Sequence, residues 1–143
     1  MNKNFKIPTN NLALALGGGA ARGAFHLGVL DFCEQNNIEI KAYSGSSIGA
    51  IISASHASGI RAKEQLKIFS SSDVKKALKF NYFKNGLLKI DTNSKIIKEL
   101  LPIEKLENIP KPVWVNAYDL KKKELHYFNS GDTITLCIAS SAL

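Results

Sequence analysis

The apolar positions near the N-terminus change their period at a cluster of glycines. Leu12–Leu16 is a short apolar run that ends at these glycines, as is typical of a buried parallel strand. Beyond them, Phe25, Val29 and Phe32 recur at the spacing of one helical stripe, and two asparagines at positions 36 and 37 favour an end to that helix. The pattern therefore predicts a strand and a helix with a glycine-rich junction between them.

The same order of strand and helix repeats in the next segment. Residues 38–44 (IEIKAYS) alternate between apolar and polar side chains, which favours a second strand. Residues 48–59 (IGAIISASHASG) indicate a helix of small residues that ends at Gly59, a natural C′ glycine. This alternation predicts an α/β fold with a mostly parallel sheet flanked by helices. Right-handed crossovers would bring both strand–helix junctions to the carboxyl edge of the sheet.

The middle of the chain is rich in lysine and predicts more helix. Residues 61–69 and 72–80 both have the amphipathic pattern of a helix, whereas residues 81–90 favour a loop or a short turn.

The last third of the chain predicts one more helix and then a pair of strands. The helix begins near Thr92 or Asn93 and is stopped by Pro102. Two strands follow around a turn at residues 119–122. The tail, residues 133–143, opens as either a strand or a helix.

Length and composition bound the class of protein. A chain of 143 residues suits one small domain, and a hydrophobic content of 45% is enough to bury a core. No apolar run is long enough to span a bilayer, and residues 1–11 form a polar lead-in without the apolar region of a signal peptide. Cys33 and Cys137 lie far apart, outside any Cys/His cluster, which favours free thiols over a metal site. We expect a cytoplasmic protein with no metal and no cofactor.

The charge balance favours an anionic partner. The formal net charge is +7, from 19 basic and 12 acidic residues, and lysine dominates. Such a surface suits an acidic lipid or membrane, and a solvated lysine-rich surface without a partner is an equally good interpretation. The chain has no arginine-rich arm, and we expect no nucleic-acid partner.

The sequence Gly45-Ser-Ser-Ile-Gly49 follows the second predicted strand and fits G-x-S-x-G, the pattern of a nucleophile elbow. In such a turn the central serine, Ser47, projects from the sheet edge on a strained backbone. The flanking glycines are needed because a Cβ would clash where the chain passes close to itself. The amide of Ile48 would face an oxyanion formed on Ser47. A glycine-bounded loop that contains serines by chance is the alternative interpretation.

A second glycine-rich junction, residues 17–23 (GGGAARG), lies between the first strand and its helix. A phosphate loop is one interpretation, but the G-x-G-x-x-G fingerprint would need glycine or alanine at Arg22, and no Walker lysine–serine pair follows. An oxyanion loop is the other, because glycine amides can converge on one oxygen. Arg22 would hold this loop or add positive potential, so the pattern favours the oxyanion loop.

Together the two motifs resemble the patatin-like phospholipase family of bacterial type, in which a GGGxRG-like loop precedes a G-x-S-x-G elbow. The stretches LALGGGAARGAFHLGVL, YSGSSIGAIISASHASG, NAYDLKKKELHYFNSGD and IASSAL carry this resemblance. It implies a patatin-like three-layer domain over residues 12–143, after the lead-in at residues 1–11.

The resemblance also implies roles for individual residues. Ser47 would be the catalytic nucleophile. Four backbone amides would form the oxyanion hole, those of Gly18, Gly19, Ala20 and Ile48. Five further residues would support the two motifs, namely Gly17, Arg22, Gly23, Gly45 and Gly49.

The family's catalytic base has no match in this chain. The family uses a Ser–Asp dyad whose aspartate lies in an Asp-Gly motif, and the sequence contains no Asp-Gly pair. The aspartates stand in helix, cap or turn contexts: Asp31, Asp73, Asp91, Asp119 and Asp132. The histidines also lack the setting of a triad base: His26, His56 and His126. We therefore expect a domain that is truncated at its C-terminal side and a chain that is itself nearly inactive.

The activity that the resemblance implies is that of a serine acyl hydrolase of the lipase or phospholipase A type. It would cleave the acyl ester bonds of lipids by a Ser–Asp dyad and a glycine-rich oxyanion hole. The missing aspartate keeps a second interpretation open, a non-catalytic patatin-like protein that binds lipid surfaces. The expected partners are a lipid or acyl ester substrate and an anionic membrane in peripheral contact, and an oligomer through the truncated face is a further option.

Overall fold

A four-stranded sheet forms the base of the protein, in a computed structural model that describes residues 11–71, 78–79, 89–90 and 95–142. The strand order is β1-β2-β5-β6, with β1–β2 and β2–β5 parallel and β5–β6 antiparallel. The predicted α/β fold with a mostly parallel sheet is therefore confirmed. The strands are β1 (Leu12–Leu16), β2 (Ile40–Gly45), β5 (Val113–Asp119) and β6 (Glu124–Phe128).

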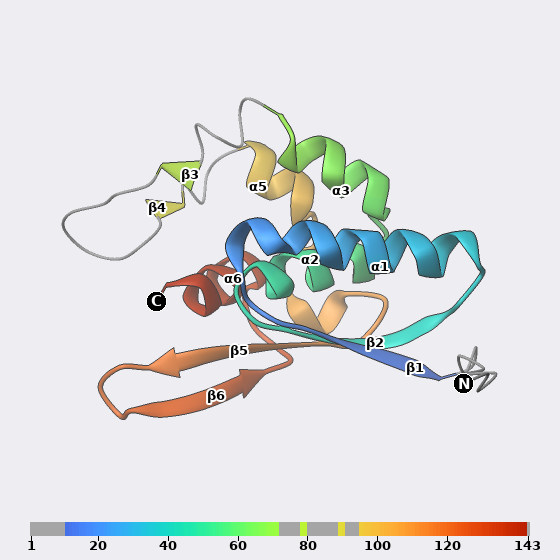
Figure 1. Ribbon diagram of the computed structural model, residues 1–143. Helices are drawn as coiled ribbons and strands as arrows, with labels where there is room; N and C mark the ends of the chain where they lie inside the picture. Colours follow the sequence, from blue (N-terminus) through green and yellow to red (C-terminus); the bar gives the residue numbers. More distant parts are fainter. Residues whose placement is uncertain (1–10, 72–77, 80–88, 91–94, 143) are drawn as a thin grey trace, which may run out of the picture.

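The helices lie over one face of this sheet (Figure 1). The connections step in one direction from β1 to β2 to β5, so right-handed crossovers place their helices on the same face. The central helix, α2, packs on the sheet with α6 beside it, while α1 and α3 pack against α2. The helices are α1 (Gly23–Gln35), α2 (Ile48–Ala57), α3 (Ala62–Phe69), α5 (Lys95–Leu100) and α6 (Thr133–Ser141).

The helix α2 is buried on every side, which explains its composition. Ala50, Ile52 and Ala54 are all fully buried. Small side chains allow the sheet, α1 and α6 to approach this helix closely from different directions, so that its apolar positions show no single buried stripe. The serine at the start of α2 is therefore held on a well-packed element.

The aromatic stripe of α1 faces outward. Phe25, Val29 and Phe32 are exposed, with Phe25 at 77% of its full accessibility. The core side of the helix is formed instead by Leu27, Leu30 and Cys33, which are buried against the rest of the core. The sequence pattern gave the period of this helix, but not which of its two apolar stripes is buried.

The face of the sheet opposite the helices carries exposed aromatic side chains. Trp114 alternates with the buried Val113 and Val115 on β5 and is 38% exposed. Tyr118 and Tyr127 are exposed on the hairpin formed by β5 and β6. In the part of the chain that the structure describes, the helices lie over the other face (Figure 1).

Most of the predicted elements are confirmed, some with shifted bounds. The first strand spans the predicted residues, the second begins two residues later than predicted, and Gly59 follows α2 with a φ of +100°. The tail is helical, as α6. Short 3₁₀ turns add η1 (Ala20–Arg22) and η2 (Leu106–Asn108).

The helix predicted over residues 72–80 is wrong at Leu78–Lys79. These residues form β3, which pairs antiparallel with β4 (Lys89–Ile90), a segment expected to be loop. Pairing with another strand overrides a local helical pattern. The remaining residues of both predictions, and the caps expected at Thr92 or Asn93, lie outside the described residues. No helix in the described part of the chain combines the length and the apolar character that crossing a bilayer requires.

Candidate active site

Ser47 lies at the turn between β2 and α2, at the carboxyl edge of the sheet. The strand ends at Gly45, the helix begins at Ile48, and Ser46 and Ser47 form the turn. Ser47 has φ 52° and ψ −124°, a conformation that non-glycine residues rarely adopt and that costs on the order of 1–3 kcal/mol. The Ser46 amide donates to the Leu16 carbonyl at 3.0 Å, which ties the turn to the end of β1. The predicted strand-to-helix elbow is therefore present.

The two glycines that flank the elbow have no room for a side chain. A Cβ on Gly45 would lie 2.5 Å from the Gly49 carbonyl oxygen and 2.6 Å from the Ala50 nitrogen. A Cβ on Gly49 would lie 2.5 Å from the Leu16 carbonyl carbon and 2.7 Å from the Gly17 carbonyl oxygen. All of these neighbours are backbone atoms, which cannot move aside as a flexible side chain can. This is the steric reason that the motif predicted.

The glycine-rich junction lies directly beside the elbow. The register pairs Leu16 with Gly45, so the residues after β1 and after β2 emerge at the same edge. A Cβ on Gly18 would lie 3.4 Å from the Ser47 Cβ. Gly19 has a φ of +150° and accepts a hydrogen bond from the Arg22 amide at 2.9 Å, which closes the loop.

Several backbone amides at this edge are available to a ligand. Across the residues that the structure describes, the amides of Gly18, Gly19 and Ile48 donate no hydrogen bond. The N-termini of α1 and α2 also meet here, because a Cβ on Gly23 would lie 2.7 Å from the Ile48 Cγ1 atom. Helix N-termini carry partial positive charge, so the site suits a negatively charged oxygen beside Ser47.

Two further side chains form hydrogen bonds at the site, and neither hydrogen bond is evident from the sequence. The His26 Nε2–H donates to the Gly17 carbonyl at 2.9 Å, which links α1 back to the glycine loop. The Ser47 amide donates to the Ser140 hydroxyl of α6 at 2.8 Å. The only sequence signal for Ser140 was the stretch IASSAL, which carried no role.

A polar network inside the protein accounts for His56. The Tyr43 hydroxyl donates to His56 Nδ1 at 2.6 Å, and His56 Nε2–H donates to a Glu34 carboxylate oxygen at 2.9 Å. This arrangement suits neutral histidine, and burial lowers the His56 pKa although Glu34 acts to raise it. Burial acts to raise the Glu34 pKa, but hydrogen bonds from the Ala62 amide, His56 and Arg61 outweigh it and lower the pKa. His56 therefore links α1, α2 and β2 and does not reach Ser47.

The described aspartates also have structural partners. Asp132 caps α6 by accepting from the Thr135 amide at 2.7 Å, and Asp119 accepts from the amides of Lys121 and Lys122 in the hairpin turn. These hydrogen bonds lower the pKa of both carboxyl groups. Asp31 lies on α1, 3.8 Å from the Lys63 ammonium.

No base stands beside the serine in the described part of the chain. The Ser47 hydroxyl makes no hydrogen bond there with an aspartate, glutamate or histidine. Residues 73 and 91, the other two aspartate positions, lie outside the described ranges.

A family model described as "Patatin-like phospholipase" matches residues 14–143. The chain belongs to the patatin-like phospholipase family. The matched region begins within β1 and includes the glycine loop, the elbow and α6.

The curated relatives of this chain align with it over only part of their own length. An uncharacterised NTE family protein of Mycobacterium tuberculosis is 28% identical over 135 residues, which cover 92% of this chain and 37% of that protein. The human patatin-like phospholipase domain-containing protein 6 is 39% identical over 66 residues, covering 44% of this chain and 5% of that protein. The chain therefore spans well under half the length of these relatives.

A solved structure has the same fold. The crystal structure of the type III effector protein ExoU aligns with a TM-score of 0.66 at 17% identity, covering 93% of this chain and 40% of ExoU. This likeness shows a common patatin-like fold.

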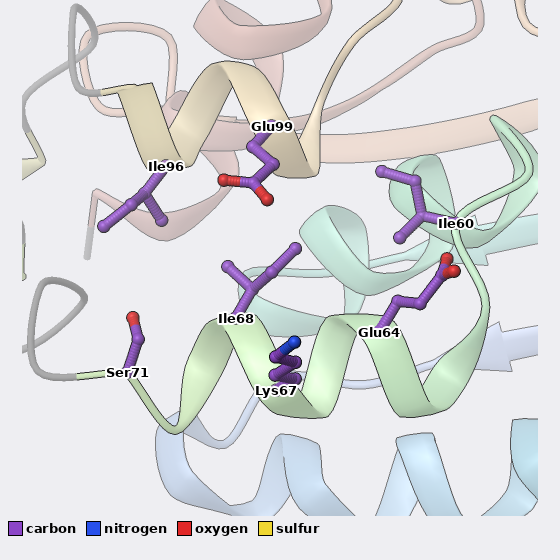
Figure 2. A pocket seen from close by; sticks show the side chains of 7 residues that line it. All are labelled: Ile60, Glu64, Lys67, Ile68, Ser71, Ile96 and Glu99. Carbon is purple, nitrogen blue, oxygen red and sulfur yellow. The ribbon is translucent and has the colours of Figure 1, made fainter.

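A hollow between α3 and α5 is separate from the elbow of this patatin-like domain. Figure 2 shows its lining, which combines apolar and charged side chains from both helices in a space of about 520 Å³. None of the lining residues belongs to the elbow or to the glycine loop; they are Ile60, Glu64, Lys67, Ile68, Ser71, Ile96 and Glu99.

Proposed function

We propose that the protein is a serine acyl hydrolase that cleaves the acyl ester bonds of lipids, with Ser47 as its nucleophile. The main support for this proposal is the strained backbone conformation of Ser47. A non-glycine residue with φ 52° stands at a strand-to-helix turn, next to a glycine loop with free amides, in a chain of the patatin-like phospholipase family. Such strain persists where function uses it.

The chemistry follows from what surrounds the serine. The Ser47 oxygen attacks the ester carbonyl while its proton passes to a base, and the carbonyl oxygen becomes an anion. The amides of Gly18, Gly19, Ala20 and Ile48 would donate hydrogen bonds to that anion. The intermediate then expels the alcohol, which takes up the proton, and leaves an acyl ester on Ser47. Water hydrolyses this ester, again with help from the base, and frees the fatty acid and the serine.

The base in this proposal is an aspartate, as the family's Ser–Asp dyad implies, and it is not among the described residues. His56 and the carboxyl groups of Glu34, Asp119 and Asp132 form hydrogen bonds elsewhere in the protein, so none of them is offered for the role. General-base assistance typically contributes ~10²–10⁴-fold to the rate. Because the sequence contains no Asp-Gly pair, we expect the 143-residue chain by itself to turn over an activated ester slowly, through the oxyanion site alone.

The test compares two neighbouring serines of the same turn. The chain, its Ser47→Ala variant and its Ser46→Ala variant are treated with a fluorophosphonate probe and with an activated ester. Labelling and ester turnover are expected to be lost in Ser47→Ala and kept in Ser46→Ala, with the label found by mass spectrometry on Ser47. Full turnover in Ser47→Ala, or a label on another serine, would overturn the proposal.

A second candidate function rests on two observations, namely that no described residue serves as a base for Ser47 and that aromatic side chains are exposed on the sheet. A patatin-like protein without catalytic activity would bind a lipid surface, and a net charge of +7 would favour an anionic one. Sedimentation with anionic and with neutral lipid vesicles separates the two functions. Binding to anionic vesicles without any labelling of Ser47 would favour the binding function.

A further inference from the structure

The amide of the elbow serine has an acceptor from a distant part of the chain. Ser47 N–H donates to the Ser140 hydroxyl oxygen at 2.8 Å, across 93 residues of sequence. Ser140 lies in the last turn of α6 and is only 5% exposed. The helix α6 lies beside α2 and packs against β5, so this contact joins the elbow to a separate element (Figure 1).

The Ser140 hydroxyl is oriented by a second partner. Its proton is directed at the Asn116 side-chain oxygen of β5, at 3.4 Å, which leaves a lone pair for the Ser47 amide. The next residue, Ser141, is buried as well, but its hydroxyl donates to the Cys137 carbonyl of its own helix at 2.9 Å. Two adjacent buried serines of one helix therefore differ in that only Ser140 reaches the elbow.

This contact acts on the strained part of the turn. The Ser47 carbonyl is held from the helix side by the Ala50 amide at 2.9 Å. The hydrogen bond from the Ser47 amide fixes the peptide plane on the other side of the same residue. With both planes held, the direction of the Ser47 Cα–Cβ bond, and hence of the hydroxyl, is set.

We propose that Ser140 is a positioning residue for the nucleophile. It accepts the Ser47 amide hydrogen bond, is oriented by Asn116, and holds Ser47 in its left-handed conformation facing the glycine loop. The effect on reactivity rests on the proposed function of Ser47, whereas the effect on the backbone does not.

The backbone effect is tested by hydrogen exchange of the Ser47 amide, followed by NMR. In Ser140→Ala this amide loses its acceptor, and we expect its exchange to be roughly fivefold to tenfold faster. Ser140→Cys keeps most of the side-chain volume but offers only a weak acceptor. If the hydrogen bond, and not packing, protects the Ser47 amide, this amide should also exchange faster in Ser140→Cys. Asn116→Ala should give a smaller change of the same sign. Ser141→Ala is the matched control and should leave the Ser47 amide unchanged.

The effect on reactivity is tested on the same proteins by the rate at which a fluorophosphonate labels Ser47. We expect labelling about tenfold slower in Ser140→Ala and Ser140→Cys, and unchanged in Ser141→Ala. Unchanged exchange of the Ser47 amide in Ser140→Ala would overturn the proposal, as would faster exchange with undiminished labelling. A third outcome separates the two proposals: the Ser47 amide exchanges faster in Ser140→Ala, but the fluorophosphonate does not label Ser47 even in the wild type. This result would support the backbone role of Ser140 and contradict the proposed hydrolase function.

Discussion

Gly49 offers a direct test of how the elbow is built, because it lies against the backbone at the end of β1. The change to make is Gly49→Ala, which adds a single methyl group at the start of α2. That methyl carbon would lie 2.5 Å from the Leu16 carbonyl carbon and 2.7 Å from the Gly17 carbonyl oxygen. Non-bonded carbon atoms rest about 3.5–4.0 Å apart, so the helix and the strand must separate by roughly 1 Å.

The separation of helix and strand is expected to lower stability through overpacking and through a strained hydrogen bond. Overpacking typically costs about 1–3 kcal/mol, and occasionally more. Here the neighbours are backbone atoms of β1, and the shift also strains the hydrogen bond from the Ser46 amide to the Leu16 carbonyl. We therefore expect a loss of about 3 kcal/mol in the free energy of unfolding, which corresponds to a fall of roughly 10 °C in Tm for a domain of this size.

The assay is unfolding in urea, followed by circular dichroism. With a slope of about 2 kcal/mol per molar urea, the midpoint should fall by roughly 1.5 M. Gly17→Ala is the matched control, because a Cβ at Gly17 would meet nothing within 4 Å, and its midpoint should stay near that of the wild type. Equal midpoints for Gly49→Ala and Gly17→Ala would refute the close approach of α2 to β1.

Two further predictions concern the strain at Ser47 and the network at His56. The free energy of unfolding of Ser47→Gly, measured by thermal melts, should exceed that of Ser47→Ala by about 1–2 kcal/mol, because glycine adopts φ 52° without strain. An equal or lower stability of Ser47→Gly would argue against a strained serine. The His56 pKa is lowered in the folded state, so its contribution to stability is present above its ordinary value of 6.5 and is lost as the pH falls below it. In the wild type the urea midpoint should decrease as the pH is lowered from 7.5 to 5.5, and in His56→Gln it should decrease less. A larger decrease in the variant would contradict a stabilising role for neutral His56.

Much of the fold could be predicted because its signals are local. Leu12–Leu16 is apolar and is followed by glycines, and these properties belong to neighbouring residues. The same holds for the elbow, where Gly45 and Gly49 reveal a turn that excludes a Cβ. Both motifs follow parallel strands, so the prediction that they meet at one sheet edge needed only the handedness of the crossovers.

Other features depended on contacts that no local pattern encodes. The sequence of residues 72–80 has a helical pattern, but Leu78–Lys79 within it pairs as a strand with Lys89–Ile90. On α1 the period was visible, yet the choice between the outward Phe25 stripe and the buried Leu27 stripe depends on where α2 and α3 lie.

From its residues alone, the chain indicates a serine between two close-packed glycines at a strand–helix junction, beside a glycine loop that follows another strand. It does so because a strained turn restricts which residues can occupy it, and that restriction can be read from the chain. The side chains that stabilise this turn are set by the packing of the whole fold. Ser140 reaches the Ser47 amide from 93 residues away, and His56 is drawn into a network with Tyr43 and Glu34. Such partners depend on how whole elements pack, which the periodicity of one segment does not specify.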